Sequence, residues 1–214
     1  MSLRKPIRLA AAGLLLVVAS AGTVAAQNDS EGNAALSPER LSAQLKHEEL
    51  SGSQVVQRAY IACGTNRFAF VVPPGYRLDG SNPDKIVLSN ADCSSYITFQ
   101  VDGQPGPSIE ELQSERCREW VLARYADARI LVDFSQSAAN HTGPAFDLEW
   151  TNSARVVQYA RVAYIPSPAG VLEFSLIATA GKFREGQYFL NSVMLTFRSN
   201  EGGKLEIVPL SDKF

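Results

Sequence analysis

The chain has 214 residues, and its 20 Lys and Arg residues against 22 Asp and Glu residues give a formal net charge of −2. This acidic balance lacks the basic stripe that nucleic-acid binding requires, and it also argues against attachment to an anionic membrane surface. The length is that of one domain of ordinary size, which can bury its own core without stabilising metals or disulfides.

The first 26 residues have the three parts of a secretory signal peptide in their usual order. A basic start is followed by an uncharged apolar run from Leu9 to Thr23 and by the small-residue cleavage site Val24-Ala25-Ala26. An uncut membrane anchor is the alternative, but the run is rich in Ala and Gly and short against the ~20 strongly apolar residues of a spanning helix. We therefore expect residues 1–26 to be removed and the product to be periplasmic or secreted, with no stable membrane insertion. Cleavage leaves 17 basic against 22 acidic residues, a net charge of −5.

Both ends of the remaining chain are expected to lie outside the main domain. Residues 27–58 read as a polar leader with a short helix to about Leu50, because Ser37-Pro38-Glu39 has Pro at the first helical position and two leucines follow at i, i+4. Residues 201–214 read as a tail with a candidate edge strand at Leu205 to Val208. Since edge strands can pair with copies of themselves, a homodimer is one option that the sequence leaves open.

Residues 59–200 are predicted to form a single globular α+β domain. Ser108 and Glu111 form a capping box at the start of its first helix, and a four-strand antiparallel meander follows. Period-two alternation is clear at residues 145–151, while the last helix has an apolar stripe at three- and four-residue steps. The predicted strands are 68–72, 85–89, 96–101, 129–136, 145–151, 156–165 and 171–180, and the predicted helices are 108–126 and 182–197.

Three cysteines remain after cleavage, and an oxidising compartment permits pairing. Cys63 and Cys93 each precede a predicted strand and are the candidate disulfide, while Cys117 falls among apolar helix positions and is expected to be a buried small hydrophobe. An odd count leaves at least one thiol free or paired between chains, and spacing alone does not fix the pairing.

The sequence offers few groups for catalysis. The two histidines, His47 and His141, are isolated, and the nucleophile elbow of hydrolases is absent. Asp79, Asn82 and Asp84 form a weak candidate metal loop, which lacks the twelve-residue calcium pattern and is better explained as a polar turn. No catalytic residue and no cofactor is therefore expected.

Two segments resemble the Mog1/PsbP-like fold family. Phe68 to Tyr76 (FAFVVPPGY) matches a strand followed by its Pro-x-Gly-aromatic turn, and Phe183 to Arg198 (FREGQYFLNSVMLTFR) matches its closing helix with a Ser-aliphatic-aliphatic-x-Phe pattern in loose register. The resemblance covers about residues 60–199. It implies a central antiparallel β-sheet flanked by helices, as an α/β/α sandwich. Members serve mostly as binding or assembly factors, of which one branch supports photosystem II and another binds a small GTPase, and none of their partner-binding residues has a counterpart motif here.

Together these features predict a noncatalytic exported binding or assembly factor with a protein partner in the cell envelope and no affinity for nucleic acid. The alternative is a small-ligand or metal-binding periplasmic protein, or an enzyme, with a cleft site. Tyr159 and Arg161 share one strand face that is either a contact surface or, as is commoner, buried under a helix.

Overall fold

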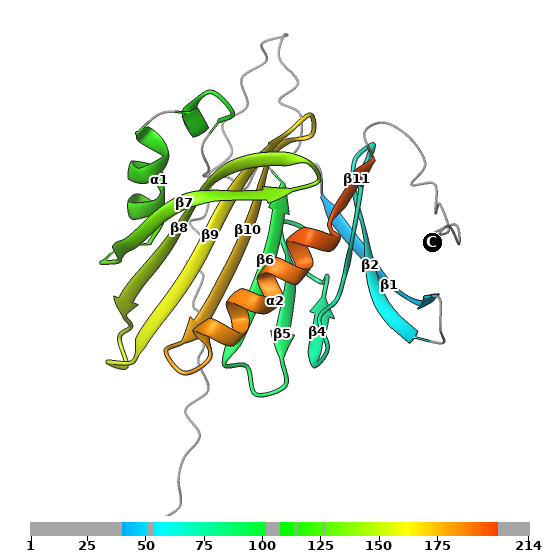
Figure 1. Ribbon diagram of the computed structural model, residues 1–214, viewed down its shortest axis with the longest axis horizontal. Coiled ribbons are helices and arrows are strands. Elements are labelled where there is room, and N and C mark those ends of the chain that lie inside the picture. The colour runs from blue at the N-terminus through cyan, green and yellow to red at the C-terminus, as the bar shows by residue number, and fades with distance from the viewer. Residues whose placement is uncertain (1–39, 51–53, 102–107, 114, 126, 201–214) are drawn as a thin grey trace, which may run out of the picture. The chain divides into compact units, whose positions relative to one another are not determined.

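The structure, a computed structural model, describes residues 40–50, 54–101, 108–113, 115–125 and 127–200, and these form two antiparallel sheets with two α-helices (Figure 1). The smaller sheet has the order β1 (Leu41–Leu50), β2 (Gln54–Cys63), β3 (Asn66–Val71) and β11 (Arg198–Asn200). The larger sheet has the order β4 (Tyr76–Asp79), β5 (Ile86–Asn90), β6 (Ser95–Val101), β10 (Gly170–Thr179), β9 (Val157–Ser167), β8 (His141–Thr151) and β7 (Arg129–Ala138). A 3-10 turn, η1 (Glu111–Gln113), precedes helix α1 (Arg116–Arg124), and helix α2 (Phe183–Thr196) leads into β11.

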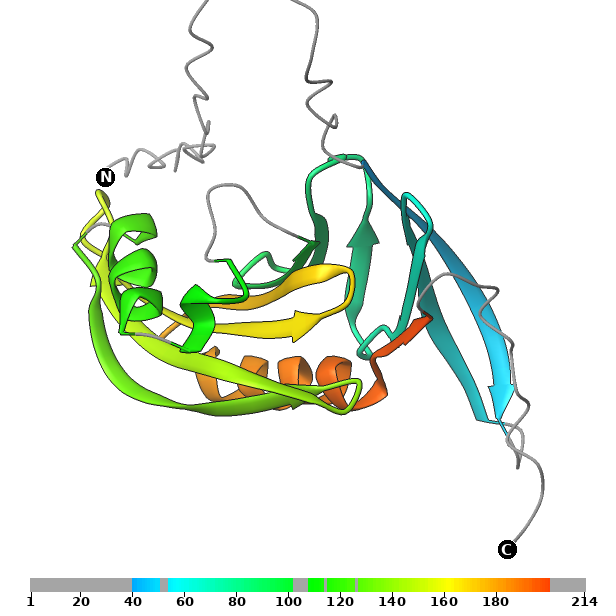
Figure 2. The same cartoon turned by 90° about the horizontal axis from the view of Figure 1, so that it is seen from above.

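The larger sheet is mostly apolar on both faces in its middle strands because a helix packs against each face. Along β9, Ala163 and Ile165 contribute to the core under α2, whereas Val162 and Tyr164 contribute to the core under α1. A strand buried on both faces reads as a nearly continuous apolar run rather than as an alternating one. Figure 2 shows α1 and α2 on opposite sides of β9 and β10.

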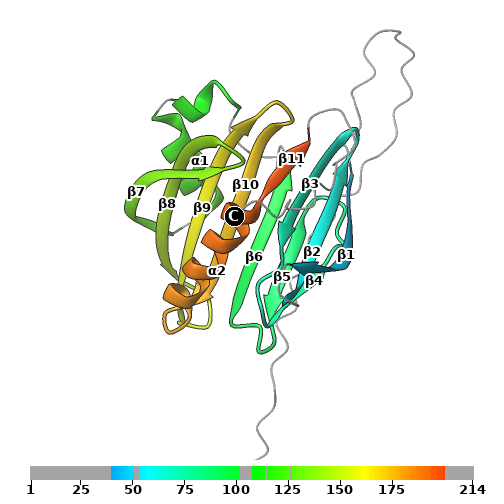
Figure 3. The same ribbon diagram turned by 45° about the vertical axis from the view of Figure 1, so that its right-hand side comes forward.

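An aromatic cluster joins the two sheets. Phe99 of β6 lies within 5.2–6.4 Å, ring centroid to ring centroid, of Phe68 and Phe70 of β3, Phe174 of β10 and Phe197 at the end of α2. All five rings are at most 3% exposed. Aromatic pairs in these edge-to-face and tilted arrangements stabilise by about 0.5–1.5 kcal/mol each beyond the area that they bury. Figure 3 shows the smaller sheet beside β4, β5 and β6 of the larger one.

The turn after β3 depends on one glycine. Gly75 has a φ of +81°, in the left-handed region that side chains other than glycine rarely adopt. The preceding prolines cannot continue the sheet ladder, so Pro73-Pro74-Gly75 ends β3 and directs Tyr76 into the larger sheet. The Pro-x-Gly-aromatic segment of the predicted resemblance is therefore the connection between the two sheets.

The coarse fold prediction is confirmed, since the described residues are mainly antiparallel strand with two helices. The α/β/α detail describes only part of the molecule, because a separate four-stranded sheet lies beyond the one that carries α1 and α2. Of the predicted elements, all seven strands have counterparts. The predicted helix at 108–126 is interrupted: Ser108 and Glu111 do form reciprocal capping bonds, with N···O distances of 2.9 and 3.4 Å, but they begin η1, and α1 starts at Arg116.

The predicted short helix before Leu50 is wrong, because this segment is strand β1. Leu41 and Leu45 are four residues apart, and this spacing places two side chains on one side of a strand as well as of a helix. β1 pairs with β2 along its whole length, and Leu41 is buried in the same core as Phe68 and Phe99. The folded sheet therefore includes residues that were expected to form a leader outside the domain.

The predicted signal peptide at 1–26, the first part of the polar leader and the candidate edge strand at Leu205 to Val208 lie outside the described residues. Neither α1 nor α2 has the length and apolar character that crossing a bilayer would require.

Candidate functional site

Helix α2 is held on the larger sheet by one continuous apolar side. Gly186, Leu190, Val193 and Met194 are buried against the sheet, and the chain turns inward again at Phe197. Gly186 sits so close to β10 that a Cβ atom there would lie 2.7 Å from Cδ1 of Leu176. The spacing of this stripe is the three- and four-residue pattern predicted from the sequence.

A polar network fixes the rotation of α2 about its own axis. Arg161 of β9 donates two hydrogen bonds to Asp147 of β8, both at 2.7 Å, and Gln187 of α2 donates a third to the same carboxylate at 3.1 Å. The Arg161 guanidinium also lies 4.6 Å from the ring centroid of Phe134. Bidentate pairs of this kind are geometrically specific, so Gln187 is held facing the sheet.

This network shows whether the strand face that carries Tyr159 and Arg161 is a contact surface or is buried under a helix. Arg161 lies under α2, and Tyr159 packs its ring 5.2 Å from the ring of Phe183 at the start of α2. The face is therefore covered by a helix, which was the preferred of the two predictions.

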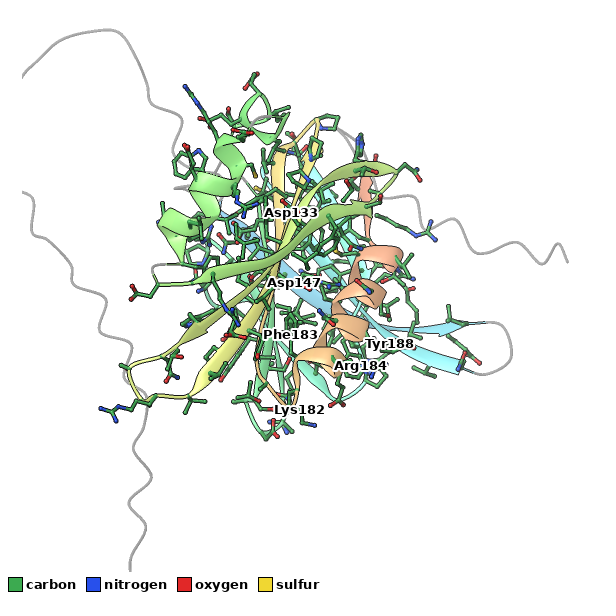
Figure 4. The ribbon with its side chains drawn as sticks, turned by 60° about the vertical axis from the view of Figure 1, so that its left-hand side comes forward. Asp133, Asp147, Lys182, Phe183, Arg184 and Tyr188 are labelled. Carbon is green, nitrogen blue, oxygen red and sulfur yellow. The ribbon has the colours of Figure 1, made fainter. Side chains whose placement is uncertain are left out.

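With Gln187 turned inward, the opposite side of α2 faces water and carries two large apolar side chains. Tyr188 is 72% exposed and Leu195 is 84% exposed. They are seven residues apart, close to two full turns, and therefore lie on the same side of the helix, with exposed Arg184 one turn before Tyr188. We call Arg184, Tyr188 and Leu195 the outer ridge; Figure 4 shows Arg184 and Tyr188 on α2 together with Asp147 on the sheet.

The outer ridge has the chemistry of a contact surface. Single exposed apolar residues are common on protein surfaces, but Leu195 and Tyr188 share one helix side and are the two most exposed large hydrophobic side chains of the described residues. Arg184 takes part in none of the ion pairs found in the described part of the chain. Tyr and Arg, together with Trp, are enriched among the residues that contribute most of the binding energy at protein interfaces.

A small pocket opens beside the start of α2. It has a volume of about 110 Å³ and is lined by residues of the Pro74–Tyr76 turn, by Asn90 and Ser95, and by Lys182, Glu185, Gly186 and Phe189. The Tyr76 hydroxyl shares a hydrogen bond of 2.8 Å with Ser95, and burial raises the pKa of Tyr76. Pockets for small organic ligands usually have ~300–1,000 Å³. This pocket is too small for such a ligand.

The face under α1 contains a buried acid. Glu173 of β10 is 2% exposed and accepts one hydrogen bond from Nη1 of Arg124 at 2.5 Å, while its Oε1 atom has no partner among the described residues. Burial raises the pKa of Glu173, and it raises the pKa of Tyr125 to about 12. Burial also raises the pKa of the adjacent Tyr164. These groups attach α1 to the sheet and present no nucleophile to solvent.

The candidate metal loop is built as a turn. Asp79 accepts a hydrogen bond from the backbone N–H of Ser81 at 2.9 Å, and Asn82 accepts one from Asp84 at 2.8 Å, so the side chains shape the backbone. Backbone and side-chain hydrogen bonds from Ser81 also hold the pKa of Asp79 below its usual value. Among the described residues no three His, Cys, Asp or Glu side chains gather as metal ligands would.

The predicted disulfide is wrong. All three cysteines lie in the described ranges, and no two of them are at disulfide distance. Cys63 is buried at the end of β2, whereas Cys93 is exposed in the turn between β5 and β6 with a φ of 55°. Adjacency to a strand in sequence does not bring residues together when the strands belong to different sheets. Cys117 is buried in α1, as expected, and burial raises its pKa to about 11.

Comparison with known proteins gives distant structural similarities only. No family model and no curated protein matches the chain. Among solved structures it is similar to PsbP from the cyanobacterium Synechocystis sp. PCC 6803, with 8% identity, a TM-score of 0.37, and coverage of 79% of this chain and 98% of that one.

Two further structures are similar at the same level. LpqN of Mycobacterium tuberculosis, described as involved in cell envelope biogenesis, has 10% identity, a TM-score of 0.42, and coverage of 75% of this chain and 92% of its own. PA94 of Pseudomonas aeruginosa, a protein of unknown function, has 10% identity, a TM-score of 0.37, and coverage of 67% and 89%. PsbP belongs to the fold family that the two segments of the sequence resemble. A likeness at this level concerns the fold alone.

The periodicity of the sequence predicts the buried stripe of α2 but not the outer ridge on the other side of the helix. The available signal was the presence of Tyr188 and Leu195, seven residues apart, at positions outside that stripe. An amphipathic helix normally has polar residues there.

Proposed function

We propose that this chain is a noncatalytic exported binding or assembly factor of the cell envelope, and that a protein partner covers the outer ridge of α2. The observation that carries the proposal is the exposure of Tyr188 and Leu195 on one side of a helix whose rotation is fixed by Gln187 and Asp147. Burying a side chain of this size in an interface contributes about 1.5–3 kcal/mol.

The charge of the molecule indicates what kind of partner fits. The mature chain is expected to be acidic. Arg184 of the outer ridge, in contrast, is basic and forms no ion pair with another described residue. A complementary surface has an apolar groove with a carboxylate at its edge, since Arg binds carboxylates through two parallel hydrogen bonds.

The alternative function, a cleft for a small ligand, has less support. The pocket of about 110 Å³ beside α2 accommodates only a group of a few atoms, and Lys182, the cation in its lining, is already bound to Glu185 at 2.9 Å. A surface that contacts another protein needs no such cavity.

In-cell crosslinking of the tagged, signal-bearing protein, with capture and mass spectrometry, tests the proposal. We expect one envelope protein to be recovered with the native sequence and lost with the double variant Tyr188→Ser/Leu195→Ser. The matched control is Leu122→Ser/Leu131→Ser, which removes two other exposed leucines, at 39% and 43% exposure, from α1 and β7. Equal recovery with both double variants would contradict the proposal, as would recovery of the protein alone.

A further inference from the structure

Strand β1 leaves one side of its backbone open. It pairs with β2 from Leu41 to Leu50. Its first residues are covered on the other side, where Leu41 donates a backbone hydrogen bond to Pro83 at 2.7 Å and where a Cβ atom at Gly80 would lie 3.1 Å from that of Ala43. From Gln44 to Leu50 no strand of the described chain pairs with the outer edge of β1. Such an edge presents unpaired N–H and C=O groups to any strand that fits.

The open stretch belongs to a two-stranded arm. β3 pairs with β2 only from Arg58 to Cys63, and a backbone bond from Val72 to Gln57 at 2.8 Å continues that side by one residue. Beyond this point β1 and β2 have only each other, and Val55 is 62% exposed. Figure 1 shows the β1–β2 hairpin extending away from the larger sheet. Two-stranded hairpins are marginally stable in water, so a further strand would stabilise the arm.

The charges on the arm are incompletely matched within one molecule. Lys46 lies directly opposite Arg58 across the ladder, a like-charge arrangement that destabilises a strand pair. Glu48 is occupied by Arg58 at 2.8 Å and by the Tyr60 hydroxyl. The Lys46 ammonium lies 5.0 Å from the Tyr60 ring centroid and forms no ion pair with a described residue.

In one register, a second copy of β1 brings a carboxylate opposite each Lys46. Consider two antiparallel copies of β1 related by a two-fold axis perpendicular to the sheet. Residues that face each other across this axis lie on the same face of the sheet, so the axis passes midway between the two copies of one residue. Centred on His47, the pairing uses the whole open stretch from Gln44 to Leu50 and places each Lys46 opposite the other copy's Glu48. Centred one residue earlier or later, it would place Lys46 opposite Lys46 or Glu48 opposite Glu48.

We propose that two copies of this chain associate through the open edges of β1, antiparallel and centred on His47. The two smaller sheets then join into one continuous sheet, and the two arms become its middle. The surface involved is separate from the outer ridge of α2, so this association stands or fails independently of the partner proposed for that helix.

Cysteine crosslinking tests the register directly. In a Cys93→Ser background, which removes the exposed thiol, His47→Cys places two thiols opposite each other at the axis. Residues directly opposite in antiparallel strands have Cα atoms about 4.5–5.5 Å apart, within the range of a disulfide. We expect His47→Cys to form a covalent dimer under mild oxidation. The matched controls are Leu45→Cys and Glu49→Cys, which lie opposite each other, so each alone stays monomeric and their mixture crosslinks.

Self-crosslinking of Leu45→Cys at the rate of His47→Cys would overturn the register. Sedimentation of the chain without cysteine changes provides the second measurement. We expect a reversible dimer that Lys46→Glu weakens at least tenfold, with Glu then facing Glu, and that Lys46→Arg retains. Thermal unfolding of the monomeric fraction checks that the variants fold. A chain that sediments as a monomer at every concentration reached, with no crosslink at His47→Cys, would overturn the proposal.

Discussion

The two helices pack on opposite faces of the same sheet and are attached by different means. α2 has four buried residues on its inner side and two large apolar side chains exposed on its outer side. α1 has nine residues, of which Cys117 and Val121 are buried, and its last turn is tied to the sheet by Arg124 and Glu173. Both helices cover strands β8 to β10. The difference in attachment therefore comes from the side chains of the helices themselves.

This difference indicates which helix is available for binding. The attachment of α2 is mainly apolar, with a hydrogen bond from Gln187 to Asp147, and the exposed Tyr188 and Leu195 lie on the other side of the helix. The attachment of α1 rests on a small apolar contact and a buried ion pair, and such pairs often add little net stability against an apolar replacement. Under the proposed function, α1 only covers the sheet, whereas α2 is held firmly enough to present its outer ridge to a partner.

The largest expected effect is loss of the α2 anchor. Leu190→Ala removes a fully buried side chain from the core under α2 and should lower the free energy of unfolding by about 2–5 kcal/mol. Urea denaturation measures it. Leu195→Ala removes the same atoms from the exposed side and should change the value by less than about 0.5 kcal/mol. Similar losses in the two variants would break the distinction between the two sides of α2.

The next effect concerns the attachment of α1. Arg124→Ala leaves Glu173 buried without its cation and should cost about 2–4 kcal/mol near neutral pH, somewhat less than for a fully buried pair because Arg124 keeps contact with water. The pKa of Glu173 is raised by burial, so the stability that its protonated form contributes is fully present below the ordinary value of 4.5 and is lost as pH rises through the folded-state pKa. Removing Arg124 raises that pKa further.

Denaturation curves at several pH values test this account. The loss from Arg124→Ala should be larger at pH 8 than at pH 5, and adding Glu173→Gln should recover most of it by removing the buried charge. A loss that is the same at both pH values, or that Glu173→Gln leaves unchanged, would show that Arg124 acts through packing alone.

The smallest effect is local opening of α1. Cys117 is 2% exposed and its pKa is raised to about 11, so it should resist a thiol reagent while Cys93 reacts at once. In rising urea, Cys117 should become reactive before the unfolding transition, because α1 is held by a small apolar contact and one ion pair and should detach first. Cys63, in the core that holds α2, should react only with global unfolding. Simultaneous reaction of both thiols would mean that the helices are equally well attached.

The sequence predicted the parts of the fold that depend on local patterns. The alternation at Phe146 and Leu148 and the stripe of α2 each identify an element without knowledge of its neighbours. The Leu41 and Leu45 pair does not, because its spacing fits a helix and a strand equally, and only the ten-residue pairing with β2 decides between them. The disulfide prediction failed for a related reason, since no local pattern assigns Cys63 and Cys93 to different sheets.

The candidate site was harder to predict. The position of the outer ridge depends on Gln187 reaching Asp147 on a strand forty residues earlier, a contact that fixes which side of α2 faces the sheet. Sequence periodicity locates the buried side only approximately. The turn at the weak metal loop, in contrast, depends on local contacts, because Asp79 and Asn82 accept hydrogen bonds from backbone groups two residues away.

The central claim is that α2 presents a protein-binding surface, and a photocrosslinking amino acid placed at position 195 tests it most directly. The reference is the same amino acid at position 122, which lies on the exposed side of α1. After irradiation of the living host, we expect one covalent adduct of defined mass from position 195 and none from position 122. The same adducts from both positions, or none from position 195, would contradict the claim.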